Sequence, residues 1–385
     1  MTYLNQIQKS INKYIAPVLL IVFFLSEAYG KIANRYFYDK SDIAKYIKFI
    51  VLLLLISASV KYLRQLKLIG LLFLLFLLGQ LTITNGFQNE IIVVFVKFLF
   101  PLFIFLYFNN NLESSNNKKL LFKTFEWLMV INSILMLIGI LLSIKLFKTY
   151  QGSRFGYNGA FFAASTGSYA YIITLMYFLL SYKEKVIKNW KFILIFISCI
   201  FIGTKAVYLA MAFTIVYIII ISKIPFKKTL LVVASLSVLL LAYYFFFHFG
   251  IFNTIRQKES LFTALMSYRD EQFWEITLPY IKENWTWINY LIGGVTDFDL
   301  RSQMDLIDVF FFWGILGGAL YLHLFFRLFL PFKMNRTGWV FISFLAFIVF
   351  LAGNFFVYSF VALFLVVLKL ILQDKNNIKL TRWVK

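Results

Sequence analysis

The feature that most constrains this chain is a succession of long apolar segments joined by short polar connections. A helix that crosses a lipid bilayer needs about 20 mostly apolar residues, and about twelve segments approach that length. We therefore expect residues 1–385 to form a single polytopic, all-α integral membrane domain. The segments lie near residues 15–29, 46–60, 67–84, 91–108, 120–144, 160–181, 191–204, 206–222, 229–247, 306–330, 338–352 and 354–372.

The composition excludes most soluble protein classes. Hydrophobic residues make up 61% of the chain and charged residues 14%, a balance that a soluble domain does not tolerate. The net charge of +21 is typical of a nucleic-acid-binding protein. However, the basic residues fall in short loops between apolar segments, where they act as topology determinants. We therefore expect no nucleic-acid partner. The single cysteine, Cys199, lies inside an apolar segment, so a disulfide framework is not expected.

The placement of lysine and arginine predicts the orientation. Cytoplasmic loops carry an excess of these residues, so we assign the more basic loops and both termini to the cytoplasm. The first opposite loop, with Lys31, Arg35, Lys40 and Lys45, is also basic but does not reverse this assignment. The outer side then holds a loop at 145–159 and the longest loop, at 248–303. The basic loops contain Lys61/Arg64/Lys67, Lys118/Lys119, Lys183/Lys185/Lys188, Lys223/Lys227/Lys228 and Lys333/Arg336.

The longest loop contains a candidate amphipathic helix between Leu261 and Lys282. Arg269 lies within its apolar stripe, although surface amphipathic helices place arginine on the polar face. An inward guanidinium needs a carboxylate or a ligand phosphate as its partner. The stripe recurs at spacings of four and three residues, the period of one helical face: Phe262, Met266, Arg269, Phe273, Ile276 and Tyr280.

Two carboxylates stand where this loop meets the next apolar segment. Asp305 and Asp308 are three residues apart, so they share a helical face. A pair of acids at a membrane boundary can simply mark the end of a span. On one face, after the longest outer loop, the pair also fits a general base or a partner for an arginine.

Two further cations occupy positions that suit an anionic ligand. Arg154 lies in the outer loop 145–159 and presents a planar fork of donors suited to phosphate. Gly156 and Gly159 beside it would allow close approach of the backbone. Lys205 follows Gly203-Thr204 between two apolar segments, where an ammonium must snorkel, line a wet cavity or pair with an anion. The alternatives are an interfacial arginine that snorkels to headgroups and a simple tight turn.

Several chemistries have no support in the sequence. There is no Walker-type glycine-lysine motif, so an ATP-driven pump is not expected. There is no HExxH motif and no cluster of histidine and cysteine, so we expect neither a metal site nor a cofactor. Energy for any reaction would come from the substrate or from a gradient.

Taken in order, these motifs resemble those of a known family. The chain is similar to the O-antigen and capsular polysaccharide repeat-unit polymerases (Wzy-type), within the superfamily that includes the O-antigen ligases. The resemblance covers residues 145–318 as motifs and the whole length as topology. It rests on Arg154-Phe-Gly with Asn158, Gly203-Thr-Lys205, Ser267-Tyr-Arg269, Leu291-Ile-Gly-Gly294, Asp305-Leu-Ile-Asp308 and Gly314-Ile-Leu-Gly317.

The resemblance implies a GT-C-like membrane glycosyltransferase in the bacterial cytoplasmic (inner) membrane. Such an enzyme joins undecaprenyl-diphosphate-linked repeat units into capsule or the O-antigen of lipopolysaccharide on the outer face, without a cofactor. Arg154 and Arg269 would bind the donor diphosphate with help from Lys205, and Asp305 or Asp308 would activate the acceptor hydroxyl. Tyr157, Asn158 and Gln303 would complete the binding site. Besides the bilayer, the implied partners are a chain-length regulator and a flippase.

Two alternatives remain open. A ligase of the same superfamily would transfer finished glycan to a lipid core. Ligases typically carry a histidine before the final glycine motif, whereas Gln303, Met304 and Asp305 stand there in this chain. A lipid-linked oligosaccharide flippase or other secondary transporter often has internal repeats and charges within its spans. No repeat is evident here, and the polar candidates gather at one face.

Overall fold

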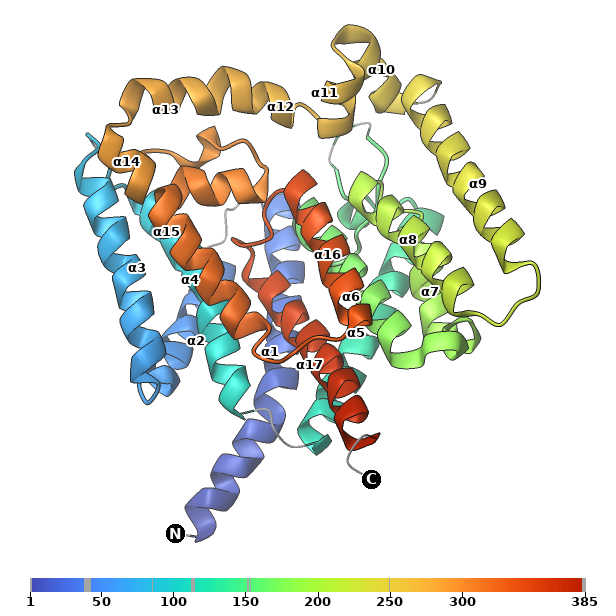
Figure 1. The fold of residues 1–385 in the computed structure, drawn as a ribbon, viewed down its shortest axis with the longest axis horizontal. Helices are drawn as coiled ribbons and strands as arrows, with labels where there is room; N and C mark the ends of the chain where they lie inside the picture. Colours follow the sequence, from blue (N-terminus) through green and yellow to red (C-terminus); the bar gives the residue numbers. More distant parts are fainter. Residues whose placement is uncertain are drawn as a thin grey trace.

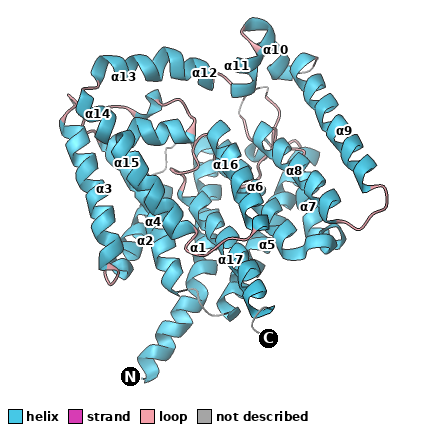
Figure 2. Cartoon of the chain, in the orientation of Figure 1, coloured by secondary structure: helices cyan, strands magenta, loops and turns pink. Residues whose placement is uncertain are grey.

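The computed structural model describes residues 2–37, 43–84, 86–111, 115–150, 152, 154–248 and 250–382. These residues form helices and connecting loops, and no strand occurs among them (Figure 2). One isolated antiparallel bridge joins Lys148 to Tyr157. The expectation of an all-α protein is therefore confirmed for the described part of the chain.

The longer helices overlap all of the apolar segments expected from the sequence (Figure 1). They are α1 (Thr2–Tyr36), α2 (Ile43–Ser59), α3 (Leu63–Leu81), α4 (Asn89–Asn111), α5 (Ser115–Leu141), α6 (Ala164–Tyr182), α7 (Trp190–Cys199), α8 (Lys205–Ile221), α9 (Lys227–Phe247), α15 (Asp305–Phe329), α16 (Arg336–Leu351) and α17 (Ser359–Arg382). Between α9 and α15 lie α10 (Gly250–Lys258), α11 (Leu261–Met266), α12 (Arg269–Glu271), α13 (Leu278–Asn284) and α14 (Trp287–Ile292).

Five described helices are long and apolar enough to cross a membrane. Four of these segments lie in the first part of the chain and the fifth is α15. Helices α7, α8 and α16 are apolar but shorter. The described part of the chain is thus all-helical and has five candidate membrane-spanning helices, as a helical membrane protein would. The five are Tyr14–Tyr36, Leu63–Leu81, Asn89–Asn109, Asn117–Leu141 and Asp305–Phe329.

Side chains that cap the first turn define where several helices begin. Asn189 Oδ1 accepts a hydrogen bond from Lys191 N at 3.0 Å at the start of α7. Asn335 Oδ1 accepts one from Gly338 N at 2.8 Å at the start of α16. The first backbone N–H groups of a helix have no partner within it, so such caps favour a defined starting residue.

The last helix lies at the centre of the bundle. Helix α17 packs against α1, α4, α5 and α6, and its residues 360–368 are buried on every side. Aromatic rings fill the contacts, with the ring of Phe364 5.2 Å from that of Phe125 in an edge-to-face arrangement. Such geometry is favourable for aromatic pairs. The centre of the fold therefore consists of apolar helices packed against one another.

A glycine break divides α15. Gly314 has φ +66° within the helix, a conformation that residues with a Cβ rarely adopt. A Cβ there would lie 2.4 Å from Gly293 N, just past the end of α14. Two of the glycine motifs recognised in the sequence therefore pack backbone to backbone. The kink sets the direction in which the first turns of α15, with both aspartates, approach the rest of the bundle.

The long segment between α9 and α15 lies across one end of the bundle (Figure 1). The prediction of a continuous amphipathic helix over Leu261–Lys282 is wrong, because the helix breaks after Met266. Ser267 and Tyr268 have φ +56° and +65°, which interrupts the helical ladder of hydrogen bonds. The helix then resumes from Arg269 as α12, a π-helical turn (Gln272–Thr277) and α13. Across the break, Thr263 Oγ1 donates to Asp270 Oδ2 at 2.8 Å.

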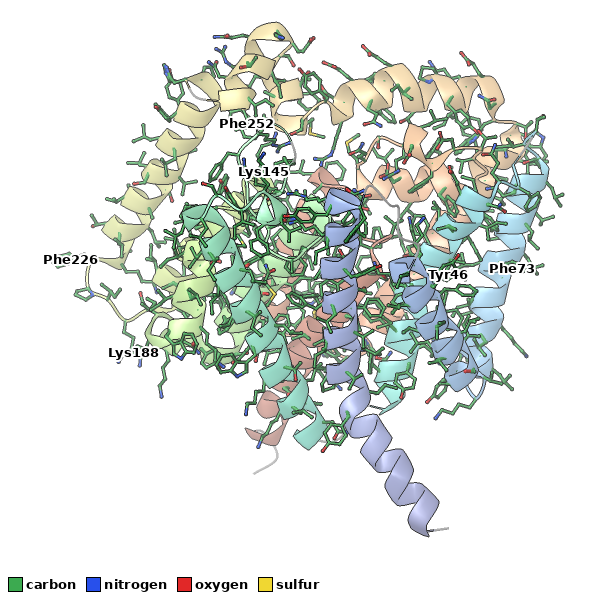
Figure 3. The ribbon with its side chains drawn as sticks, turned by 180° about the vertical axis from the view of Figure 1, so that it is seen from behind. Tyr46, Phe73, Lys145, Lys188, Phe226 and Phe252 are labelled. Atoms are coloured by element: carbon green, nitrogen blue, oxygen red, sulfur yellow. The ribbon has the colours of Figure 1, made fainter. Side chains whose placement is uncertain are left out.

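Both chain termini lie at the opposite end of the bundle from this segment (Figure 1). Seen from behind, Lys145 and Phe252 are near the end where α10 lies, and Lys188 is farther toward the end where α1 begins (Figure 3). The loop around Lys145 and the basic loop around Lys188 thus lie toward opposite ends of the bundle.

Candidate functional site

Glycines bring the loop of Arg154 against the start of α8. A Cβ at Gly203 would lie 2.3 Å from Phe155 O, and Gly203 has φ +75°. A Cβ at Gly156 would lie 2.6 Å from Ile202 O. Two motifs that are distant in sequence therefore meet through their backbones. The close backbone approach that Gly156 allows is therefore made by another part of the same chain.

Lys205, the first residue of α8, holds the long outer segment in place. Its ammonium donates to the backbone oxygens of Ala264 and Leu265, the latter at 2.8 Å. The same group lies over the ring of Phe252, 4.5 Å from the centroid, a favourable arrangement for a cation. Lys205 thus satisfies the last carbonyl groups of α11. It accounts in part for the position of the break that follows.

Arg269 directly follows that break, and its side chain is half-buried. Its Nη1 donates to Leu351 O at 2.8 Å, at the end of α16. Its Nε is buried and has no hydrogen-bond partner among the described residues. Burial lowers the pKa of the Arg269 guanidinium, whereas the nearby Tyr169 and Asp305 raise it. An arginine stays protonated in proteins, so Arg269 is a half-buried cation whose buried Nε still has a hydrogen bond to donate.

The three cations predicted from the sequence gather at one place. Arg154 stacks on the ring of Tyr150, with 4.0 Å between the guanidinium carbon and the centroid. Burial raises the pKa of the Tyr150 hydroxyl, and the charges of Arg154 and Arg269 oppose that shift. Those two charges also act on Lys205. We call Arg154, Lys205 and Arg269 the basic cluster. Like charges that act on one another in this way favour an anionic ligand beside them.

Asp305 is buried and its carboxylate is well satisfied. Both of its oxygens accept from Phe355 N, at 3.0 and 2.9 Å. Tyr169 Oη, from α6, donates to Oδ2 at 3.3 Å. The carboxylate therefore anchors the loop between α16 and α17 to the first turn of α15. Its charge also reaches Arg269 of the basic cluster.

Asp308 has a different environment, with one oxygen available. Its Oδ1 accepts from Ser302 Oγ at 3.0 Å. Its Oδ2 is buried without a hydrogen-bond partner in the described structure and lies 3.6 Å from Arg301 Nε. That separation is too long for a good hydrogen bond. A buried carboxylate oxygen without a hydrogen bond is the arrangement expected where a further group must bind.

Arg301 is the residue that the sequence analysis missed. Its guanidinium also donates to Asn354 Oδ1 at 3.0 Å and lies over the ring of Phe298, 4.4 Å from the centroid. The sequence offers one signal for it, an arginine four residues before Asp305 in the outer loop. Because the intervening residues are not helical, periodicity could not link Arg301 to either aspartate.

The remaining candidates make contacts within the protein. Tyr157 N donates to Phe201 O at 2.7 Å, and its side chain is buried. Asn158 Oδ1 accepts from the ammonium of Lys31. Gln303 Nε2 donates to Gln272 Oε1 at 3.2 Å. These contacts position the loops that carry the basic cluster and the aspartates.

No group of three or more His, Cys, Asp or Glu residues within the described ranges could hold a metal ion. Comparison with known proteins found no match, whether with family models, curated proteins or solved structures. A functional assignment therefore has to rest on the geometry of the basic cluster and of the two aspartates.

Proposed function

We propose that this protein is a membrane glycosyltransferase that joins repeat units carried on undecaprenyl diphosphate into a surface polysaccharide, O-antigen or capsule. The observation that carries the proposal is the basic cluster of Arg154, Lys205 and Arg269 beside Asp305. Cations positioned where negative charge develops stabilise a leaving diphosphate. A nearby carboxylate can accept the proton of an attacking hydroxyl.

The reaction requires one displacement. The acceptor hydroxyl oxygen forms a bond to the anomeric carbon of the carrier-linked chain. The bond from that carbon to the diphosphate oxygen breaks, and the diphosphate leaves with the electron pair toward the basic cluster. The hydroxyl proton passes to an aspartate. The glycosidic linkage is thereby exchanged for the diphosphate linkage, so the chemistry calls for no nucleotide sugar and no cofactor.

Asp308 is the better candidate for the base. Its Oδ2 has no hydrogen-bond partner in the described structure, whereas both oxygens of Asp305 accept from Phe355 N. In this proposal Asp305 positions the loop before α17, and Arg301 moves away from Asp308 when the acceptor binds. Apo hydrogen bonds in active sites are often long and tighten with substrate.

The proposal extends to topology. Twelve spans with a GT-C-like arrangement would place both termini in the cytoplasm and the segment 248–303 outside, in the cytoplasmic membrane of a bacterium. The support is that both termini lie at the end of the bundle opposite to α10–α13 (Figure 1). The substrate would then enter from the outer leaflet, where the basic cluster meets the lipid headgroup region. A chain-length regulator and a flippase would work beside it.

The test is the size profile of carrier-linked glycan in a strain that lacks the gene. Carrier-linked single repeats on the outer leaflet, with polymer restored by the wild-type gene, are the expected result. Long polymer that stays on the carrier would instead identify a ligase. Single repeats confined to the inner leaflet would identify a flippase. Either of these two results would overturn the proposal.

A further inference from the structure

A cavity of about 350 Å³ is lined by Arg301, whose Nε lies 3.6 Å from Asp308 Oδ2, whereas Asp308 itself does not line it. Small-molecule sites range from about 300 to 1,000 Å³, so the cavity is large enough for a sugar. Its walls come from α2, the first turns of α4, the loop 297–301 and the loop before α17. None of the residues of the basic cluster lines it. The cavity is thus a separate site, joined to the aspartate pair through one guanidinium.

The cations that line the cavity favour an anionic group in it. Lys97 lines the cavity from α4, within a membrane-spanning segment, and its side chain is exposed there, without a hydrogen bond or ion pair to the described residues. The charges of Arg301, Lys48 and Lys45 act on it, opposed by Asp299. Asp299 Oδ1 accepts from Arg301 Nη1 at 3.0 Å, and its side chain is 92% exposed, so a carboxylate that binds Arg301 would replace or join this solvent-exposed ion pair. A cation within a span calls for a partner, and neighbouring cations increase that need.

The rest of the lining is not that of a simple phosphate site. Glu90 and Asp297 contribute carboxylates, and Asn89 and Asn354 contribute amides. Acids repel a doubly charged diphosphate more strongly than a group with a single charge. Acids and amides also match the hydroxyl groups of a sugar, which both donate and accept hydrogen bonds. A few convergent polar groups beside apolar residues such as Val94 are typical of a specific small-molecule site.

We propose that this cavity binds a sugar that carries a carboxylate, with the carboxylate on Lys97 and Arg301. This inference rests on the proposed function, within which the sugar belongs to the acceptor repeat unit. A carboxylate bound to Arg301 would draw its guanidinium away from Asp308 Oδ2, which is 3.6 Å distant. The acceptor would thereby release the base that its own hydroxyl requires. The substrates of this protein are therefore acidic glycans.

Binding to the purified full-length protein in lipid nanodiscs tests this directly, without turnover. The probes are cellobiuronic acid, which carries one carboxylate, its neutral counterpart cellobiose, and inorganic pyrophosphate. We expect cellobiuronic acid to bind at least about tenfold more tightly than cellobiose, the effect of one charge-assisted hydrogen bond. The Lys97→Met variant should abolish that difference. Lys45→Met, at the exposed rim, should reduce it.

Lys282→Met is the matched control, because it removes an exposed cation of α13 outside the cavity and should leave cellobiuronic acid binding unchanged. Equal affinity for the two disaccharides, or a difference that survives in Lys97→Met, would overturn the proposal. Pyrophosphate binding that is lost in Lys97→Met, without any preference for cellobiuronic acid, would reassign the cavity to the phosphate of a carrier lipid. Reactivity of the buried Cys199 with a thiol dye on heating reports whether each variant is folded.

This binding test is independent of the test of polymerisation. If the protein prefers cellobiuronic acid but its deletion strain still makes long polymer, the sugar-binding site is supported and the polymerase function is refuted. Single repeats in the deletion strain, without that preference, would retain the polymerase and refute the acidic acceptor.

Discussion

Arg301 Nε lies 3.6 Å from Asp308 Oδ2, and neither atom has a hydrogen-bond partner in the described structure. The pair joins two environments, because Arg301 lines the cavity while Asp308 is buried in the first turn of α15. A buried ion pair with such a gap gains little from its attraction compared with the cost of desolvating both groups. Its persistence is better explained by a role in binding and catalysis than by stability.

Replacement of Asp308 by asparagine should stop polymer formation in a folded protein. The amide keeps the shape and can still accept from Ser302, but it cannot take a proton. We expect a loss of about 10²- to 10⁴-fold in polymer synthesis, the usual contribution of a general base. Rates measured with purified lipid-linked repeat units provide the check. Asp305→Asn should instead lower the melting temperature, because an amide cannot accept from Phe355 N through both of its terminal atoms. A fully active Asp308→Asn variant would show that another residue acts as the base.

Arg269→Ala should abolish long polymer while the protein remains in the membrane. Removal of the guanidinium withdraws one of the cations expected to stabilise the leaving diphosphate, a loss of about 10²-fold or more. Arg269→Lys should restore little activity, because an ammonium lacks the planar fork. Lys282→Ala is the control, since Lys282 is an exposed cation of α13 in the same outer segment. Gel profiles of surface glycan in the complemented strain measure the result, and equal losses in both alanine variants would count against a specific role for Arg269.

Gly314→Ala should destabilise the fold. A left-handed conformation at a residue with a Cβ costs about 1–3 kcal/mol, and the new Cβ would lie 2.4 Å from Gly293 N. We expect the melting temperature to fall by roughly 5 °C or more. Cys199 is the single cysteine and is buried, so its reactivity with a thiol dye on heating follows unfolding. Gly70→Ala in α3 is the matched control, because a Cβ there would meet nothing within 4 Å. A shift of the same size in both variants would show that the kink does not require glycine.

Asn158→Ala should reduce stability more than it reduces substrate affinity. Asn158 accepts from the ammonium of Lys31, which also donates to Gly159 O at 2.7 Å. Loss of the amide leaves a buried cation short of a partner, at a cost of about 1–3 kcal/mol. The double variant Lys31→Met/Asn158→Ala should be less destabilised than the sum of the single variants, because the two residues share one interaction. The thiol-dye assay measures all three, and strict additivity would show that the contact has no energetic weight.

The sequence by itself determined the class of fold and the identity of most of the charged residues discussed above. Runs of about 20 apolar residues have to become helices in a membrane, and lysine placement separates the two ends of the bundle. Arg154, Lys205 and Arg269 stood out because a cation beside apolar segments is costly. These are local properties, so they can be recognised along the chain.

The tertiary structure alone decided which of these residues meet. The glycine contact between Gly156 and Gly203 brings Arg154 toward Lys205, and the break at Ser267 and Tyr268 directs Arg269 inward. The pairing of Arg301 with Asp308, and the cavity beyond it, follow from a non-helical loop to which periodicity does not apply. Close backbone packing and left-handed residues depend on partners that are distant in sequence, so a pattern along one segment cannot reveal them.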